Sequence, residues 1–114
     1  MKTTRPISWI KAARKDFDDF PEVVPHDMLT ALTVAAEGEK LDNAKPFRGI
    51  DGGVFEVALR HRGDAFCVIY AVKIGTDIWV IHAFQKKSKT GIKTPQTDIN
   101  LIRERLRHLK EAIK

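Results

Sequence analysis

Two helical runs of apolar residues occupy the first part of the chain. Between residues 10 and 20 and again between 25 and 36, apolar positions recur every three or four residues. Pro21 separates the two runs, and Gly38 follows the second. The pattern predicts two helices joined as an αα-hairpin. The preceding segment PISWI, residues 6–10, is a candidate for a short strand.

The hydrophobic period changes from about 3.6 to two after Pro46. Residues 53–84 contain three alternating runs with turn signals at Gly63-Asp64 and Gly75-Thr76, and a short strand is also considered at 47–50. A final amphipathic helix is expected from Pro95. We therefore predict a single α+β domain over residues 1–114, with an antiparallel β-sheet and the N-terminal αα-hairpin and C-terminal helix packed on one face. The other face, the open face, would then be uncovered.

Two-residue loops at both turns would determine which side chains share the open face. In that register Arg60 faces Cys67, and Ala71 faces Val80. The side chains expected on the open face are those of Glu56, Arg60, Arg62, Cys67, His82, Phe84 and Lys86. Its floor would consist of Ala58, Ile69, Ala71 and Val80. A slip by one residue would exchange the faces, so the assignment depends on both loop lengths.

Charge is distributed unevenly along the chain, whose net charge is +5. Residues 1–44 carry six basic and eight acidic side chains, whereas residues 45–114 carry 14 basic and seven acidic ones. The basic part indicates an anionic partner, with nucleic acid first and an acidic protein as the alternative. A single cysteine excludes an internal disulfide bond, and there is neither a membrane-length apolar run nor a secretory signal pattern. We expect a cytoplasmic protein without membrane association.

The segment IHAFQKKSKTG, residues 81–91, concentrates candidate chemistry at the end of the last strand. Lysines attract phosphate, Phe84 offers a ring for base stacking, and His82 titrates near neutral pH, as proton transfer requires. A lone histidine on a strand also fits a structural role, and Glu56 could simply pair with Arg60. Four histidines without ligand spacing and one cysteine favour no metal site, and no cofactor is expected.

The order of these motifs resembles the RelE/HigB-like type II toxin superfamily, in particular its phage-derived subgroup. The resemblance rests on GGVFEVALRHRGDAFCVIYAV and on the residues His82, Phe84, Lys86, Lys87, Pro95, Arg103 and Arg105. It implies a compact RelE-like domain and a toxin that cleaves mRNA, often on the ribosome, without metal. The ribose 2′-hydroxyl would attack the adjacent phosphate. A helix-turn-helix antitoxin would be the protein partner.

Two arginines that are common in this superfamily are absent, at Ala58 and Cys67. Losing one such phosphate contact typically costs about 3 kcal/mol of transition-state stabilisation. The first hypothesis is an endoribonuclease in which His82, Lys86 and Arg60 are catalytic. Its expected RNA-binding residues are Arg62, Phe84, Lys87, Lys89, Glu56 and Cys67. The alternative is a degenerate, non-catalytic toxin homologue that binds an antitoxin or the ribosome.

Overall fold

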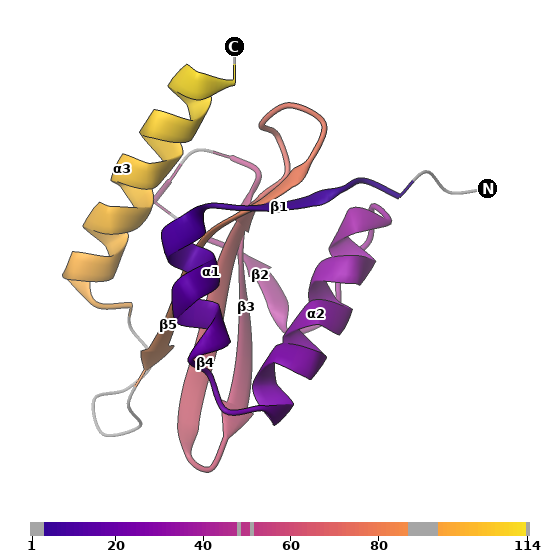
Figure 1. The fold of residues 1–114 in the computed structure, drawn as a ribbon, viewed down its shortest axis with the longest axis vertical. Coiled ribbons are helices and arrows are strands. Elements are labelled where there is room, and N and C mark those ends of the chain that lie inside the picture. Colours follow the sequence, from indigo (N-terminus) through magenta and orange to yellow (C-terminus); the bar gives the residue numbers. More distant parts are fainter. Residues whose placement is uncertain (1–3, 48, 51, 87–93, 114) are drawn as a thin grey trace.

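The computed structural model describes residues 4–47, 49–50, 52–86 and 94–113 as an α+β domain (Figure 1). Five strands form one sheet in the order β1-β5-β4-β3-β2. The elements are β1 (Ile7–Trp9), α1 (Lys11–Asp18), α2 (Val23–Ala36), β2 (Ala44–Pro46), β3 (Val54–His61), β4 (Asp64–Ala71), β5 (Ile78–Lys86) and α3 (Gln96–Ala112). The predicted α+β class with a mostly antiparallel sheet is confirmed. None of the described helices is both long and apolar enough to span a membrane.

Helices α1 and α2 cover the first face of the sheet. Phe17 from α1 and Met28 and Leu32 from α2 are each at most 2% exposed, and they pack against Val57 and Val68 of the sheet. Helical spacing places such residues on one stripe, which must be buried against another layer. Each large apolar side chain buried in this way contributes about 1.5–3 kcal/mol. The predicted αα-hairpin is therefore held to the sheet by its own apolar stripe.

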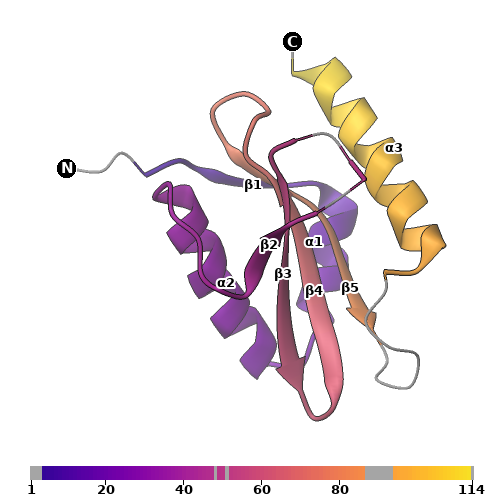
Figure 2. The same ribbon diagram turned by 180° about the vertical axis from the view of Figure 1, so that it is seen from behind.

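Helix α3 packs on the second face, opposite α1 and α2, which differs from the predicted placement on one face. Its buried residues Ile102, Leu106 and Leu109 join Cys67 and Ile69 in a separate core cluster. The physical reason is that β4 and β5 present apolar side chains on both faces, so the second face also needs a cover. Figure 2 shows α3 beside β5, with β2 and β3 free of any helix on this side. The second face is thus half covered rather than open.

The turn between β3 and β4 consists of Arg62 and Gly63, not of Gly63 and Asp64 as predicted. His61 pairs with Asp64, and the turn residues have φ values of 51° and 88°. A two-residue turn that matches sheet twist needs positive φ at both positions, and glycine suits the second. The register consequently moves by two residues, so Cys67 faces Ala58 and Arg60 faces Ala65. A shift of two preserves the face of every residue.

The connection between β4 and β5 is longer than predicted and is followed by a bulge. Residues 72–77 form the loop, and the register shifts at Ile69/Tyr70. Cys67 still faces Phe84 and Ile69 still faces His82, as predicted. Val80, however, faces Tyr70 and belongs to the core of the first face, so its predicted place on the open face is wrong. The extra residue of the bulge changes the side on which the following side chains lie.

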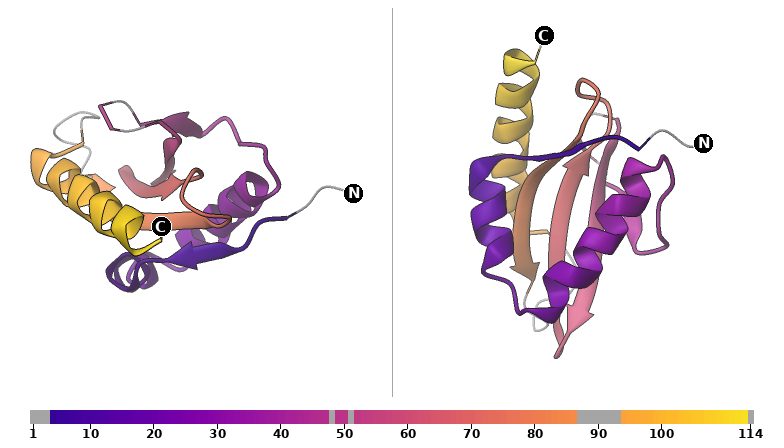
Figure 3. Two further views of the ribbon diagram at one scale, coloured as in Figure 1. Left: turned by 90° about the horizontal axis from the view of Figure 1, so that it is seen from above. Right: turned by 45° about the vertical axis from the view of Figure 1, so that its right-hand side comes forward.

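Strand β1 pairs in parallel with the outer edge of β5, a pairing that alternation within the sequence does not indicate. The contact covers only Ile78–Val80 of β5, whereas β5 continues to Lys86. The right-hand view of Figure 3 shows β1, in indigo, at the upper end of β5, where the paired residues Ile78–Val80 lie. No described strand pairs with the outer edge beyond Val80. Among the described strands, the C-terminal half of β5 therefore forms an edge of the sheet.

Candidate functional site

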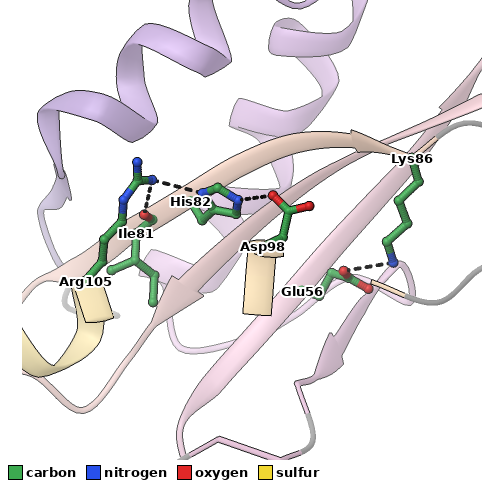
Figure 4. Close-up of polar contacts among 6 residues, drawn as sticks. All are labelled: Glu56, Ile81, His82, Lys86, Asp98 and Arg105. Carbon is green, nitrogen blue, oxygen red and sulfur yellow. Dashed lines mark hydrogen bonds and ion pairs between the residues drawn. The ribbon is translucent and has the colours of Figure 1, made fainter. Parts of the chain in front are cut away.

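An acidic and a basic side chain meet on the second face beyond the cover of α3. Lys86 Nζ lies 3.2 Å from Glu56 Oε2, and the side chains are 9% and 20% exposed (Figure 4). The same ammonium lies 5.7 Å from the centre of the Phe84 ring. Strand pairing puts both side chains on the same face, since Lys86 faces Ala65 and Glu56 faces Ile69, positions of equal parity on β4. These positions are four residues apart, so the long lysine side chain spans the remaining distance along the strand. The predicted placement of Glu56 and Lys86 on one face is confirmed.

His82 has both ring nitrogens engaged by side chains of α3. Its Nε2 lies 2.7 Å from Asp98 Oδ1, and its Nδ1 lies 2.9 Å from Arg105 Nη1 (Figure 4). Arg105 Nη1 also donates to the Ile81 carbonyl oxygen at 3.1 Å. A guanidinium can only donate, so Nδ1 accepts and Nε2 carries the proton that is donated to Asp98. This network selects the neutral tautomer of the imidazole.

Burial also favours the neutral state of His82. The side chain is 3% exposed, and this desolvation is the main cause that lowers the pKa of His82 below its usual value. The Asp98 hydrogen bond acts in the opposite direction, and the Arg105 charge lowers the pKa further. Neither ring nitrogen is available to a substrate in this arrangement. His82 joins β5 to α3, which is the structural role left open for it at the sequence level.

Phe84 and Cys67 are less accessible than the sequence suggested. The Phe84 ring stacks on His82 at a centroid distance of 5.1 Å and is 8% exposed, so little of it is left for a nucleobase. Cys67 is 0% exposed and lies in the core cluster with α3. Burial, followed by the nearby charge of Glu56, raises the pKa of the Cys67 thiol to about 12. The expectation that Cys67 lies on an accessible surface is wrong.

The remaining predicted site residues are spread over different places. Arg60 is exposed on the second face, where it faces Ala65 near the hairpin end. Arg62 is in the turn with positive φ, so it is not part of the sheet face as predicted. Lys87 and Lys89 lie outside the described residues. The second face thus keeps Glu56, Arg60 and Lys86 together as its charged group.

Three residues that were not among the predicted site residues complete this picture. The short strand predicted at 47–50 lies instead at 44–46, as β2. Lys45 of β2 therefore faces Glu56 of β3, and its side chain is exposed. Asp98 and Arg105 lie seven residues apart on α3, two helical turns on one side, close to the buried stripe. Two charged residues seven positions apart, next to the apolar stripe of a predicted helix, could have indicated in the sequence that this helix binds a buried polar side chain. Among the described residues, no three His, Cys, Asp or Glu side chains gather as metal ligands.

Comparison with known protein families supports the grouping that the motifs suggested. The family model described as "Phage derived protein Gp49-like (DUF891)" matches residues 15–107, which is most of the chain. The chain belongs to this Gp49-like family. A search among curated proteins gave no match.

Solved structures similar to this Gp49-like chain are RelE toxins and a complex that contains one. A double mutant of the E. coli toxin RelE in the free state matches with a TM-score of 0.62 at 15% identity, covering 92% of this chain and 97% of that one. The isolated E. coli RelE toxin matches with a TM-score of 0.58 at 17% identity, covering 88% and 98%. The RelBE2 toxin–antitoxin complex from Mycobacterium tuberculosis gives 0.53 at 17% identity, covering 78% and 98%. At these identities the likeness shows the fold, and the Gp49-like chain has the RelE fold.

Proposed function

We propose that this chain is the toxin of a type II toxin–antitoxin pair and that it cleaves mRNA without metal. The observation that carries the proposal is the Glu56–Lys86 pair, 3.2 Å apart on a partly uncovered sheet face. Lys45 faces Glu56 from β2, and Arg60 extends the same face toward the hairpin. A carboxylate between cations combines a proton acceptor with groups that bind phosphate.

In the proposed reaction Glu56 accepts the proton of a ribose 2′-hydroxyl. The 2′-oxygen attacks the adjacent phosphorus, the bond to the 5′-oxygen breaks, and a 2′,3′-cyclic phosphate and a 5′-hydroxyl result. Lys86 supplies the proton for the leaving oxygen, while Lys45 and Arg60 stabilise the negative charge that develops on the phosphate. Binding of a phosphate beside Lys86 would weaken its ion pair with Glu56 and so release the carboxylate for proton transfer. His82 contributes by positioning Phe84 and, through it, Lys86.

The proposed partners are a helix-turn-helix antitoxin and mRNA on the ribosome. The antitoxin is supported by the RelE fold and by a similar solved structure that is described as a toxin–antitoxin complex. The ribosome and mRNA are supported by the resemblance to the toxin superfamily and by the basic C-terminal part of the chain. We place the protein in the cytoplasm on the same grounds.

A second candidate function is that of a non-catalytic binding homologue. Ala58 and Cys67 face each other at the positions where the superfamily commonly carries arginine, and Cys67 is buried as a neutral thiol. Two missing phosphate contacts would each remove transition-state stabilisation of about 3 kcal/mol. Binding to an antitoxin or the ribosome would then persist while cleavage is lost.

Cleavage of an end-labelled RNA separates the two candidates. We expect the wild-type protein to cut the RNA in excess chelator and to leave the 2′-deoxy analogue intact. Glu56→Gln should lower the cleavage rate about 10²–10⁴-fold, as loss of a general base does, with RNA affinity almost unchanged. Lys86→Met should weaken both, whereas Lys15→Met, which removes an exposed cation on α1, should change neither.

The outcomes are distinct. Binding without cleavage by the wild-type protein would favour the second candidate. Cleavage that survives Glu56→Gln at the full rate would remove Glu56 from its proposed role. Absence of cleavage, together with absence of binding to free RNA, to ribosomes and to an antitoxin encoded beside the gene, would contradict both candidates.

A further inference from the structure

A hollow lined by cations lies between α3 and the chain that follows β2. Its volume is about 290 Å³, and its described lining residues are Gly49, Ile50, Arg103, Leu106, Arg107 and Lys110. The three cations recur every three or four residues on α3, so they share one side of the helix, and all three are exposed. The floor is apolar, because Leu106 belongs to the core of the second face and Ile50 packs against it. We refer to this hollow as the cationic hollow.

Arg103 holds the two walls of the cationic hollow together. Its Nη2 donates a hydrogen bond to the Gly49 carbonyl oxygen at 3.1 Å, which ties the chain after β2 to α3. Gly49 has a φ of 86°, a conformation that glycine adopts without strain. A guanidinium has five N–H donors, so Arg103 keeps donors for a ligand while one of them binds Gly49. The hollow is therefore held in shape before a ligand arrives, which lowers the cost of binding.

The contacts that Arg107 makes within α3 are weak. Its Nη1 lies 3.4 Å from Glu111 Oε1, and the two side chains are 62% and 60% exposed. Its Nη2 lies 3.1 Å from His108 Nε2. An ion pair this exposed contributes little, because water and salt screen it. A phosphate group can accept two parallel hydrogen bonds from one guanidinium, so it can replace Glu111 as the partner of Arg107.

The two sides of α3 carry opposite charge. Beside the C-terminal half of β5 the described surface forms a larger hollow of about 1090 Å³, in which five carboxylates accompany a single arginine. The cationic hollow, on the other side of the helix, has no carboxylate among its described lining residues. Such a separation of charge directs a polyanion toward the cationic side and away from the acidic one. The cationic side is also the one next to β2, on the half of the second face that no helix covers.

The cationic hollow lies within reach of an RNA bound at the Glu56–Lys86 pair. Lys45 faces Glu56, and Gly49 is four residues further along the chain. Four residues span at most about 14 Å, so a few nucleotides of single-stranded RNA are enough to cover the distance. The hollow lies beyond the start of β3, whereas Arg60 lies near its end. It would therefore extend the contact with RNA in one direction from the pair.

We propose that the cationic hollow binds neighbouring phosphate groups of the RNA backbone, a few nucleotides away from the bond that is cleaved. The inference rests on the proposed function, since it gives the RNA at the Glu56–Lys86 pair a second contact. Arg103 and Lys110 are seven residues apart, about 10 Å along the helix, so the three cations can bind more than one phosphate. Arg103 and Arg107 would donate hydrogen bonds to phosphate oxygens, and Lys110 would add charge. Phosphate contacts position a strand without reading its bases.

Binding of a fluorescent 12-nucleotide 2′-fluoro RNA, measured by anisotropy over a range of salt concentrations, tests the proposal. This RNA lacks the attacking hydroxyl, so its binding does not depend on cleavage. Arg107→Gln combined with Lys110→Gln should weaken binding at least about tenfold at about 0.1 M salt. The slope of log affinity against log salt should become shallower by about 0.7–1.4, since each lost phosphate contact with a single strand accounts for about 0.7. Arg103 is kept, so the chain after β2 stays tied to α3.

Lys11→Gln combined with Lys15→Gln provides the matched control. This variant also removes two exposed cations, but they lie on α1, which covers the opposite face of the sheet. Its affinity should stay within about twofold of that of the wild type, and its salt slope should be unchanged. Thermal unfolding should be the same for all three proteins, which separates loss of binding from loss of fold.

Cleavage kinetics add a second measurement. With a 12-nucleotide RNA that carries ribose hydroxyls, the Arg107→Gln/Lys110→Gln variant should raise KM and leave kcat nearly unchanged, because the hollow touches no reacting atom. Failure of the wild type to cleave would contradict the proposed function alone, since the 2′-fluoro RNA would still report binding in the hollow.

Three results would overturn the proposal. An unchanged salt slope in the Arg107→Gln/Lys110→Gln variant would mean that these cations do not contact RNA. An equal loss of affinity in the α1 control would reduce the effect to net charge. Loss of binding to fluorescent polyglutamate by the same variant, with RNA binding retained, would assign the cationic hollow to an acidic protein instead.

Discussion

Replacing His82 by phenylalanine tests whether this side chain is a neutral link between β5 and α3. Phenylalanine keeps a ring of similar size that can stack on Phe84, but it removes the contacts to Asp98 and Arg105 at 2.7 and 2.9 Å. Hydrogen bonds to charged partners contribute about 1.5–3 kcal/mol each. In the variant, Asp98 can still be hydrated, because its side chain is 23% exposed, and Arg105 still donates a hydrogen bond to the Ile81 carbonyl oxygen. We expect a loss of about 2–4 kcal/mol in the free energy of unfolding at pH 7.5.

The pH dependence of that loss identifies the protonation state. The pKa of His82 is lowered in the folded protein, so the unfolded chain takes up its proton at a higher pH than the folded one does. The contribution of a group with a lowered histidine pKa is fully present above about pH 6.5 and is lost as the pH falls toward the folded pKa. Between pH 7.5 and 5.5 the gap between wild type and variant should therefore narrow, by up to about 1.4 kcal/mol.

Urea unfolding at pH 7.5, 6.5 and 5.5 measures the effect, with His26→Phe as control because His26 is exposed on α2. The control should keep the pH dependence of the wild type. A gap that widens as the pH falls would mean that His82 is protonated in the folded state, with Asp98 and the more distant charge of Asp16 outweighing burial and Arg105. That result would refute the neutral link and restore His82 as a candidate acid.

Three further predictions concern buried or strained positions. The Cys67 thiol, with its pKa raised to about 12, should react with an aromatic disulfide at pH 8 at least tenfold more slowly in the folded than in the unfolded protein, and equal rates would contradict its burial. Cys67→Arg should lower the free energy of unfolding by about 3 kcal/mol, since a guanidinium must enter the core below α3; an unchanged melting temperature would show that α3 makes room. Gly53→Ala should cost about 1–2 kcal/mol, from strain at φ 84° plus a Cβ that would lie 2.7 Å from the Lys73 side chain. Gly38→Ala, at φ 89° without neighbours within 4 Å, should cost less; equal losses would mean that Lys73 moves aside freely.

The sequence alone determined the helices, the three strands of the meander and most of the residues of the second face. Periodicity is a local property, so the change from 3.6 to two near Pro46 was sufficient to predict the αα-hairpin, the three-stranded meander and α3. Glu56 and Lys86 were correctly placed on one face although the first turn was misplaced, because its error of two residues preserves alternation. The bulge beside Ile69 had no such signal, and Val80 was consequently assigned to the wrong side.

The tertiary structure alone decided which face α3 covers and which side chains it brings to His82. Asp98 and Arg105 are 16 and 23 residues away from His82 along the chain, beyond the reach of any local pattern. The apolar stripe of α3 could be buried against either face of the sheet. Helices α1 and α2 cover the first face, whereas the second face presents the apolar side chains of Cys67, Ile69 and Ile81. Burying that second apolar surface is what turned a histidine expected to face solvent into one that is 3% exposed and doubly hydrogen-bonded.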